Sequence, residues 1–143
     1  MNRRDFALGA GALALTACAT RAVSAATPLL FAYFTTGKGE ADGLKLATSD
    51  DGFTFCTLAG GRSLLVPQVG EKKLMRDPFL FHDNDTYHLL WTTAWEGVTI
   101  GHATSTDLIR WSPQRAIPVM ATIAGTRNCW APEAVYDPRA RHW

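Results

Sequence analysis

Asp77 is the residue of this sequence that is best placed to do acid–base chemistry. It stands between Arg76 and Pro78 and directly precedes the apolar residues 79–81, so it opens a segment with the pattern of a buried strand. Because proline restricts the residue before it, we expect Pro78 to hold Asp77 in an extended conformation and its carboxylate in one orientation. Such a carboxylate can take a proton from water as a general base. The structural alternative is an Asp that ends a turn and caps a neighbouring amide.

Glu133 is the second acidic residue of interest, because it also opens a strand by the sequence repeat described below. Trp130 lies close before it, and Trp95 lies in a predicted loop. Aromatic side chains offer flat apolar faces on which a ring-shaped ligand can stack, so Trp130 and Trp95 are candidates for ligand contact. Glu133, close to Trp130 in the sequence, is a third candidate. For each of them, packing inside the protein is an equal alternative. Trp91 and Trp111 fall on strand patterns, and we expect both in the core.

The sequence carries no signature of a metal centre, a nucleotide site or a nucleic-acid interface. Its four histidines show no metal-ligand spacing with the cysteines, and it has no phosphate loop, dinucleotide fingerprint or Gly-x-Ser-x-Gly elbow. The formal net charge is only +1, so no nucleic-acid partner is expected. Apolar residues make up 47% of the chain, which is enough for a substantial core. We therefore expect a globular domain that works without a cofactor.

Short strands are the only regular elements that the sequence predicts after residue 27. Apolar positions do not recur with the period of a helix, whereas short apolar or alternating runs are separated by Gly, Asp, Asn and Pro. Residues 83–85 predict the tight turn of a hairpin. The predicted strands span residues 29–35, 44–48, 78–82, 87–93 and 98–104. The fold class is therefore expected to be all-β.

The strands also belong to a repeat with a period of 54 to 57 residues. A repeat of this length in a chain of strands is typical of a β-propeller, whose blades of four strands take roughly 40–50 residues. The alternative is a β-sandwich with accidental similarities, but the similar segments recur in the same order. The repeat pairs residues 33–36 with 90–93, residues 46–51 with 102–107, and Pro78 and Asp83 with Pro132 and Asp137.

The repeat also bears on the extent of the chain. Propellers close with roughly four to eight blades, whereas this sequence holds roughly two to two and a half repeats. Residues 141–143 come where the repeat predicts the start of a strand. We therefore expect residues 27–143 to be the N-terminal, truncated part of a longer propeller.

Residues 1–26 have the pattern of an export signal. A charged start is followed by an apolar stretch too short to span a bilayer. The paired arginines before Phe6 resemble a twin-arginine signal, and residues 15–18 resemble a lipobox in which Cys18 would be lipidated. Ordinary cleavage after residues 23–25 is the alternative. We expect an exported protein, periplasmic or held on the membrane only by a lipid anchor at Cys18.

Cys56 and Cys129 would both stay in the exported protein, where an oxidising compartment could join them. Their separation in the sequence says nothing about their distance in the fold. Two separate buried thiols are therefore the simpler interpretation.

Three segments of the sequence resemble glycoside hydrolase family 43. Residues 76–81, with the strand 85–90 after the turn, look like the first catalytic blade of that family. Residues 103–111 resemble its S-x-D-L-x-x-W segment, and residues 129–137 resemble the W-A-P-[DE] opening of its next blade. The three motifs occur in the family's order and lie within residues 74–143.

The resemblance implies a five-bladed β-propeller that cleaves arabinofuranosyl or xylosyl linkages of plant polysaccharides with inversion. Its partner would be an oligo- or polysaccharide. Asp77 matches the family's general base, while the general acid, a Glu, and the Asp that tunes its pKa would lie beyond residue 143. Some members of the family hold a calcium ion in the channel, although no residue here indicates one. We assign to substrate binding Arg76, Trp95, Trp130 and Glu133.

The chemistry of inversion supports carboxylates from separate blades. A water on one face of the sugar and a proton donor on the other require carboxyl groups roughly 6.5–9.5 Å apart. Neighbouring residues of one strand do not easily supply such opposed groups, whereas blades around a channel do. The base must stay ionised, and we expect Arg76 or Arg127 to favour that form.

Three other functions fit parts of the pattern. A surface propeller that binds carbohydrate without catalysis would keep the pocket at residues 130–133 but lack a general acid. A propeller that binds another protein would use Asp77 only to cap a turn. The related fructan- and sucrose-cleaving enzymes retain configuration and use the aspartate of an Asn-Asp-Pro motif as the nucleophile, but here Arg76 stands in place of that Asn.

Overall fold

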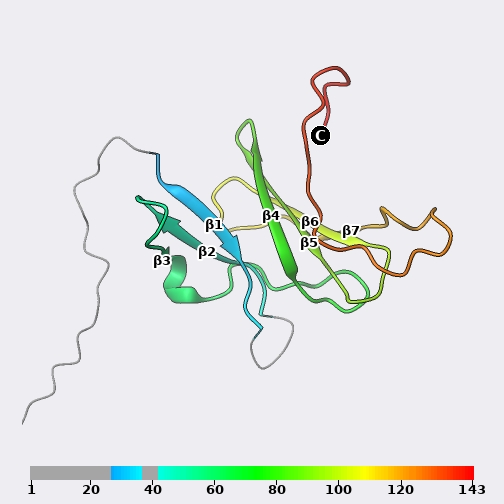
Figure 1. The fold of residues 1–143 in the computed structure, drawn as a ribbon. Helices are drawn as coiled ribbons and strands as arrows, with labels where there is room; N and C mark the ends of the chain where they lie inside the picture. The colour runs from blue at the N-terminus through cyan, green and yellow to red at the C-terminus, as the bar shows by residue number, and fades with distance from the viewer. Residues whose placement is uncertain (1–26, 37–41) are drawn as a thin grey trace, which may run out of the picture.

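The computed structural model describes residues 27–36 and 42–143, and nearly all of the regular structure within them is β-strand (Figure 1). Seven strands of the described part form two antiparallel sheets. The first sheet contains β1 (Leu29–Tyr33), β2 (Lys45–Ser49) and β3 (Cys56–Thr57), and a short 3₁₀ turn, η1 (Leu58–Gly61), follows it. The second sheet contains β4 (Arg76–Asp83), β5 (Thr86–Thr92), β6 (Ile100–Ser105) and β7 (Arg115–Ile117). The expected all-β class is confirmed.

Both sheets are meanders in which each strand pairs with the next one along the chain. β4 and β5 form a tight hairpin in which Asp83 pairs with Thr86, and Asn84 takes a positive φ of 52° in the turn. The hairpin turn is thus where the sequence predicted it. The five expected strands correspond to β1, β2, β4, β5 and β6, whereas β3 and β7, of two and three residues, were not predicted.

The core lies between the two sheets and is built around Trp91 of β5. The indole packs against Gly101 of β6, where an added Cβ would come within 1.9 Å of Trp91 Cε2, so only glycine fits at that position. Trp111 packs against the same cluster, so both expected core tryptophans are confirmed. The other buried members of the cluster are Leu44, Leu46, Leu65, Met75, Leu89 and Ala103.

The turn after β2 is held by two side chains that accept hydrogen bonds from the backbone. Ser49 Oγ accepts from the amide of Gly52 at 2.9 Å. Asp51 Oδ1 accepts from the amides of Phe53 at 2.8 Å and Thr54 at 2.7 Å. These bonds satisfy amides that no strand partner could reach.

The turn after β6 repeats this arrangement atom for atom. Ser105 Oγ accepts from the amide of Leu108 at 2.8 Å. Asp107 Oδ1 accepts from the amides of Ile109 at 2.9 Å and Arg110 at 2.7 Å. Equivalent turns at equivalent places in the two sheets show that the similarity of residues 46–51 and 102–107 is structural and not accidental.

The export signal and Cys18 lie outside the described residues, so their assignment stays a prediction. No helix of the described part is long and apolar enough to cross a bilayer. Cys129 carries a free thiol and is therefore not joined to Cys56.

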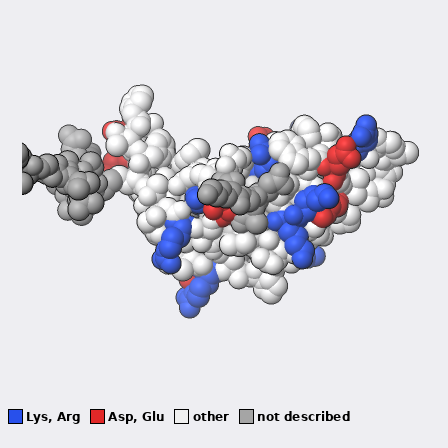
Figure 2. All heavy atoms as spheres, turned by 90° about the horizontal axis from the view of Figure 1, so that it is seen from below, with Lys and Arg blue, Asp and Glu red and all other residues white. Residues whose placement is uncertain are grey.

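Charged side chains are mixed over the surface. On the face seen in Figure 2, Lys and Arg side chains lie among Asp and Glu side chains and do not gather in one basic patch. Ion pairs of the described part join Lys45 to Asp42 at 2.9 Å and Arg110 to Asp107 at 2.8 Å. Because these pairs are local and partly or largely exposed, they contribute little to the stability of the fold.

The repeated turns predict an acid-sensitive contribution to stability. The amides of Thr54 and Phe53 donate to Asp51 and lower the pKa of its carboxyl from 3.8 to about 2. A pKa that is lower in the folded than in the unfolded chain stabilises the fold above the unfolded value, and this stabilisation is lost as the pH falls through the folded value. The urea midpoint of Asp51→Asn should therefore decline less between about pH 4 and about pH 2 than that of the unsubstituted protein.

Asp50→Asn is the matched control, because Asp50 is adjacent in sequence but is not the acceptor of the turn amides. The urea midpoint of Asp50→Asn should decline with falling pH as that of the unsubstituted protein does. The same acid sensitivity in Asp51→Asn as in the unsubstituted protein would contradict this role of the turn.

Candidate active site

Asp77 lies on a β-bulge at the start of β4. Arg76 pairs with Thr92 and Phe79 pairs with Leu90, so three steps along β4 oppose two steps along β5. The extra residue makes the strand bend, and Asp77 takes a φ of 48°, in the left-handed region. The expected extended conformation is therefore wrong: strand pairing, and not the following proline, sets the backbone here. A bulge of this kind turns its side chain away from the regular alternation of the strand.

The conformation of Asp77 is strained for a residue with a side chain. Residues other than glycine rarely adopt a positive φ, and holding one there costs about 1–3 kcal/mol. Asp tolerates this region better than most residues because its short polar side chain can bond locally. Such strain is commonest at functional positions, where the surrounding structure must hold the residue in place.

Ala131 is the structural counterpart of Asp77 in the third repeat. It also precedes a proline and has a φ of 47°. Six residues further on, Asp137 bridges to His142, as Asp83 pairs with Thr86 in the second repeat. Ala131 thus takes the place of Asp77, and Glu133 lies two residues further along and not at the first position that the sequence repeat suggested.

Thr92, at the end of β5, connects these two counterparts. Its hydroxyl donates to Asp77 Oδ2 at 3.0 Å and accepts from the amide of Ala131 at 2.8 Å. Thr92 is 1% exposed, so both hydrogen bonds are sheltered from water. One buried hydroxyl therefore fixes the carboxylate of Asp77 and ties the start of the third repeat to the second sheet.

A hollow of about 160 Å³ opens beside the carboxylate of Asp77. Its walls are Arg76, Asp77, Thr92, Trp95 and Trp130. A second hollow, of about 190 Å³, lies on the other side of Asp77 and Pro78 and is bordered by Glu133. The four residues that the sequence assigned to substrate binding are thus brought together around Asp77.

Trp95 and Trp130 form one wall of the first hollow. Their rings meet edge to face, with centroids 5.9 Å apart and an interplanar angle of 87°. The indole N–H of Trp130 donates to the carbonyl oxygen of Trp95 at 3.0 Å. Trp95 is 47% and Trp130 51% exposed, so neither belongs to the core and both leave aromatic surface open to solvent.

Arg76 lies on the aromatic wall of the same hollow. Its guanidinium carbon is 4.4 Å from the ring centre of Trp95 and 4.9 Å from that of Phe34, which are cation–π distances. Arg127, the other cation expected beside the base, instead pairs with Glu96 at 2.9 Å on the surface. Of the two cations considered, Arg76 and not Arg127 therefore borders the hollow beside Asp77.

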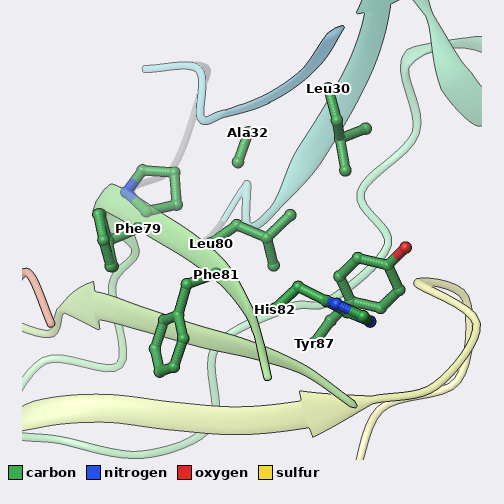
Figure 3. Close-up of a pocket in the computed structure, with 8 residues that line it drawn as sticks. Leu30, Ala32, Phe79, Leu80, Phe81, His82 and Tyr87 are labelled. Carbon is green, nitrogen blue, oxygen red and sulfur yellow. The ribbon is translucent and has the colours of Figure 1, made fainter. Parts of the chain in front are cut away.

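A larger hollow, of about 250 Å³, lies between β1 and β4 (Figure 3). Leu30 and Ala32 of β1 face the residues of β4 across it, and Tyr87 of β5 closes one end. The polar groups of this wall are the His82 ring and the Tyr87 hydroxyl, and no carboxylate lines it. The hollow beside Asp77 is therefore the better candidate for acid–base chemistry.

A comparison with known protein families places the chain. The family model of a probable glycosyl hydrolase domain, related to glycoside hydrolase family 43, matches residues 25–143. The chain belongs to this family of glycosyl hydrolase domains. The resemblance of the motifs to glycoside hydrolase family 43 is thus confirmed as a family relationship. No curated protein and no solved structure matches the chain.

The glycosyl hydrolase domain has further polar groups that the sequence patterns did not single out. Thr92 belongs to a Thr-Thr pair that the repeat places at residues 35–36 and 92–93, and this repetition is the signal that could have identified it. Glu71 lies in an irregular segment, and its contacts are with residues 22 to 28 positions away, so no local pattern could have found it.

Among the described residues, the histidines do not form a metal site with other ligands. His88 Nδ1 lies 3.3 Å from His102 Nε2, and burial, followed by the charges of His88 and Arg115, lowers the pKa of His102. Within the described residues, no three His, Cys, Asp or Glu side chains are grouped as a metal site would require.

The bridge through Thr92 predicts a loss of stability when its hydroxyl is removed. Thr92→Val keeps the shape but leaves the Ala131 amide and the Asp77 carboxylate without their shared partner, and unsatisfied buried groups cost about 1–3 kcal/mol. The free energy of unfolding, measured with urea, should fall by about that amount. Thr92→Ser keeps the hydroxyl and is the control. A Val variant as stable as the Ser variant would contradict the bridge.

Proposed function

We propose that this glycosyl hydrolase domain is the front part of an exported glycosidase in which Asp77 is the general base. The observation that carries the proposal is the carboxylate of Asp77. Its backbone is strained, the buried hydroxyl of Thr92 fixes it, and it lies beside a hollow with an exposed aromatic wall. A fixed carboxylate activates water, and an aromatic wall binds the apolar face of a sugar ring. Both are what the hydrolysis of a glycosidic bond requires.

The proposed reaction inverts the anomeric centre of an arabinofuranosyl or xylosyl linkage. Asp77 takes a proton from a water molecule as the water attacks the anomeric carbon, and a general acid on the opposite face protonates the leaving oxygen. These two carboxyl groups must lie roughly 6.5–9.5 Å apart. We propose that the acid, and the aspartate that tunes its pKa, come from strands that follow residue 143.

The proposed architecture is a five-bladed propeller in which the second sheet is one blade. This four-stranded meander has the composition of a complete blade. The first sheet carries the equivalent turn but has three strands. β1 is the edge strand of this sheet and contacts β4. A fourth strand beside β1 would cover the apolar hollow of Figure 3 and complete a second blade.

In the proposed site, substrate binding falls to the aromatic wall and its two neighbours. Trp95 and Trp130 offer exposed rings on which a sugar can stack. Arg76 offers donors to the sugar hydroxyls, and Glu133 borders the adjoining hollow, where a second sugar unit can lie. The partner is therefore an oligo- or polysaccharide, reached outside the cytoplasm through the export signal or a lipid anchor at Cys18.

Asp77→Asn in the complete protein tests the base. Asn keeps an oxygen that accepts from Thr92, so the fold and the sugar affinity should be preserved. Loss of the base should lower kcat by on the order of 10²–10⁴-fold on an aryl arabinofuranoside or xyloside. Asp85→Asn, in the hairpin turn at the other end of β4, is the matched control. Near-normal turnover by Asp77→Asn would refute the assignment.

The stereochemistry of the product tests the mechanism separately. Proton NMR of the freshly released sugar should show the inverted anomer. A retained anomer would instead support the relation to fructan- and sucrose-cleaving enzymes, with Asp77 as nucleophile. Sugar binding by calorimetry with no turnover by the complete unsubstituted protein would identify a carbohydrate-binding propeller.

A further inference from the structure

We propose that Glu71 is a positioning residue that fixes the loop of Trp95 and so sets the place of the aromatic wall. The inference rests on the proposed function, because it takes Trp95 as a surface for sugar. Glu71 lies before β4, in the irregular segment between the two sheets, and contacts neither Asp77 nor the hollow beside it among the contacts described. Its effect on substrate would therefore be exerted through Trp95.

The carboxylate of Glu71 receives hydrogen bonds from both ends of the loop. Thr93, just before the loop, donates its hydroxyl to Oε2 at 3.0 Å. Beyond the loop, the amide of Val98 donates to Oε1 at 3.0 Å and the hydroxyl of Thr99 donates to Oε2 at 2.6 Å. The four residues between these anchors include Trp95. The two ends also meet directly, since the Thr93 hydroxyl lies 3.0 Å from the carbonyl oxygen of Thr99, and Glu71 adds its carboxylate to this junction.

Two glycines make room for this contact. A Cβ on Gly97 would lie 2.6 Å from the carboxyl carbon of Glu71, which is too close for any real contact. Gly70 has a φ of 87°, and a Cβ there would lie 2.2 Å from Cβ of Thr93. The segment that carries Glu71 therefore fits tightly against both ends of the loop, and the positive φ of Gly70 allows the close approach.

The carboxylate is held in its charged form. Burial raises the pKa of Glu71, but hydrogen bonds from Thr99, from its own backbone, from Val98 and from Thr93 outweigh this effect and leave the pKa below its usual value. Burial, followed by the negative charge of Glu71, also raises the pKa of the thiol of Cys129, the residue that precedes Trp130.

The other connections of the loop reach the same segment. The amide of Gly97 donates to the carbonyl oxygen of Arg127 at 2.9 Å. Glu96 pairs with Arg127, but both side chains are more than 70% exposed, at 73% and 79%, so the pair contributes little order. The charge-assisted bonds to Glu71 are stronger than this exposed pair, and they restrain the loop together with the Thr93–Thr99 contact and the bond from the Trp130 indole to the carbonyl oxygen of Trp95.

Glu71→Gln tests the inference, with Glu96→Gln as the matched control on the same loop. The Gln amide group would face donors, so the loop should loosen and KM for an oligosaccharide should rise on the order of tenfold while kcat changes little. This pattern is expected when a contact made equally by substrate and transition state is lost. Glu96→Gln should leave KM unchanged. If Glu71→Gln does not fold, Thr99→Val removes the shortest bond without changing the carboxylate.

A double-mutant cycle with Trp95→Ala separates positioning from general stability. If Glu71 acts through Trp95, Glu71→Gln should not raise KM further once Trp95 is absent. An equal rise in both backgrounds, or no rise in either, would overturn the inference. The near-UV circular dichroism of the Trp95–Trp130 pair should weaken in Glu71→Gln, and this signal does not depend on sugar. An unchanged signal would overturn the positioning role, whereas a changed signal without any sugar binding by the unsubstituted protein would refute only the proposed function.

Discussion

The burial of Trp91 between the two sheets is the constraint on which the rest of the structure depends. Trp91 lies against Gly101, and it fixes the end of β5 in the core. The next two residues are also buried, and their side chains alternate as a strand requires. Thr92 points to Asp77 and Ala131, whereas Thr93 points to Glu71 and the loop of Trp95. Three consecutive residues therefore hold the core, the proposed base and the aromatic wall.

Much of the fold could be predicted from the sequence, because alternation and turn residues are local signals. The hairpin after Asp83 and the repeated Ser–Asp turns follow from short patterns. The bulge at Asp77 could not be predicted in this way, because it arises from how β4 pairs with β5. Glu71 was missed for a similar reason, since its partners are brought to it only by the packing of the chain. Candidate site residues could be predicted where they belong to a short motif. They could not be predicted where only contacts between distant parts of the sequence bring them to the site.

The site combines two equivalent positions that contribute different groups. Asp77 and Ala131 share a positive φ before proline, and a glycine would adopt this backbone with less strain. At Asp77 the strain is tolerated together with a carboxylate that a glycine could not provide. At Ala131 the backbone amide is the group used, since it donates to Thr92. The repeat thus supplies the same backbone geometry twice. Only at Asp77 does the residue at this position also supply a carboxylate.

This division explains why the proposed base and acid belong to different repeats. An inverting reaction needs two carboxyl groups that face each other across the sugar, roughly 6.5–9.5 Å apart. Within β4, the residues after Asp77 return to the alternation of a strand that is paired on one side with β5 and packed on the other against the core. Asp83, the other carboxylate of β4, lies at the opposite end of the strand beside the hairpin turn, away from the hollow at Asp77. An opposing acid is therefore better placed at the equivalent position of another repeat, where the same bend of the backbone would direct its side chain toward the site.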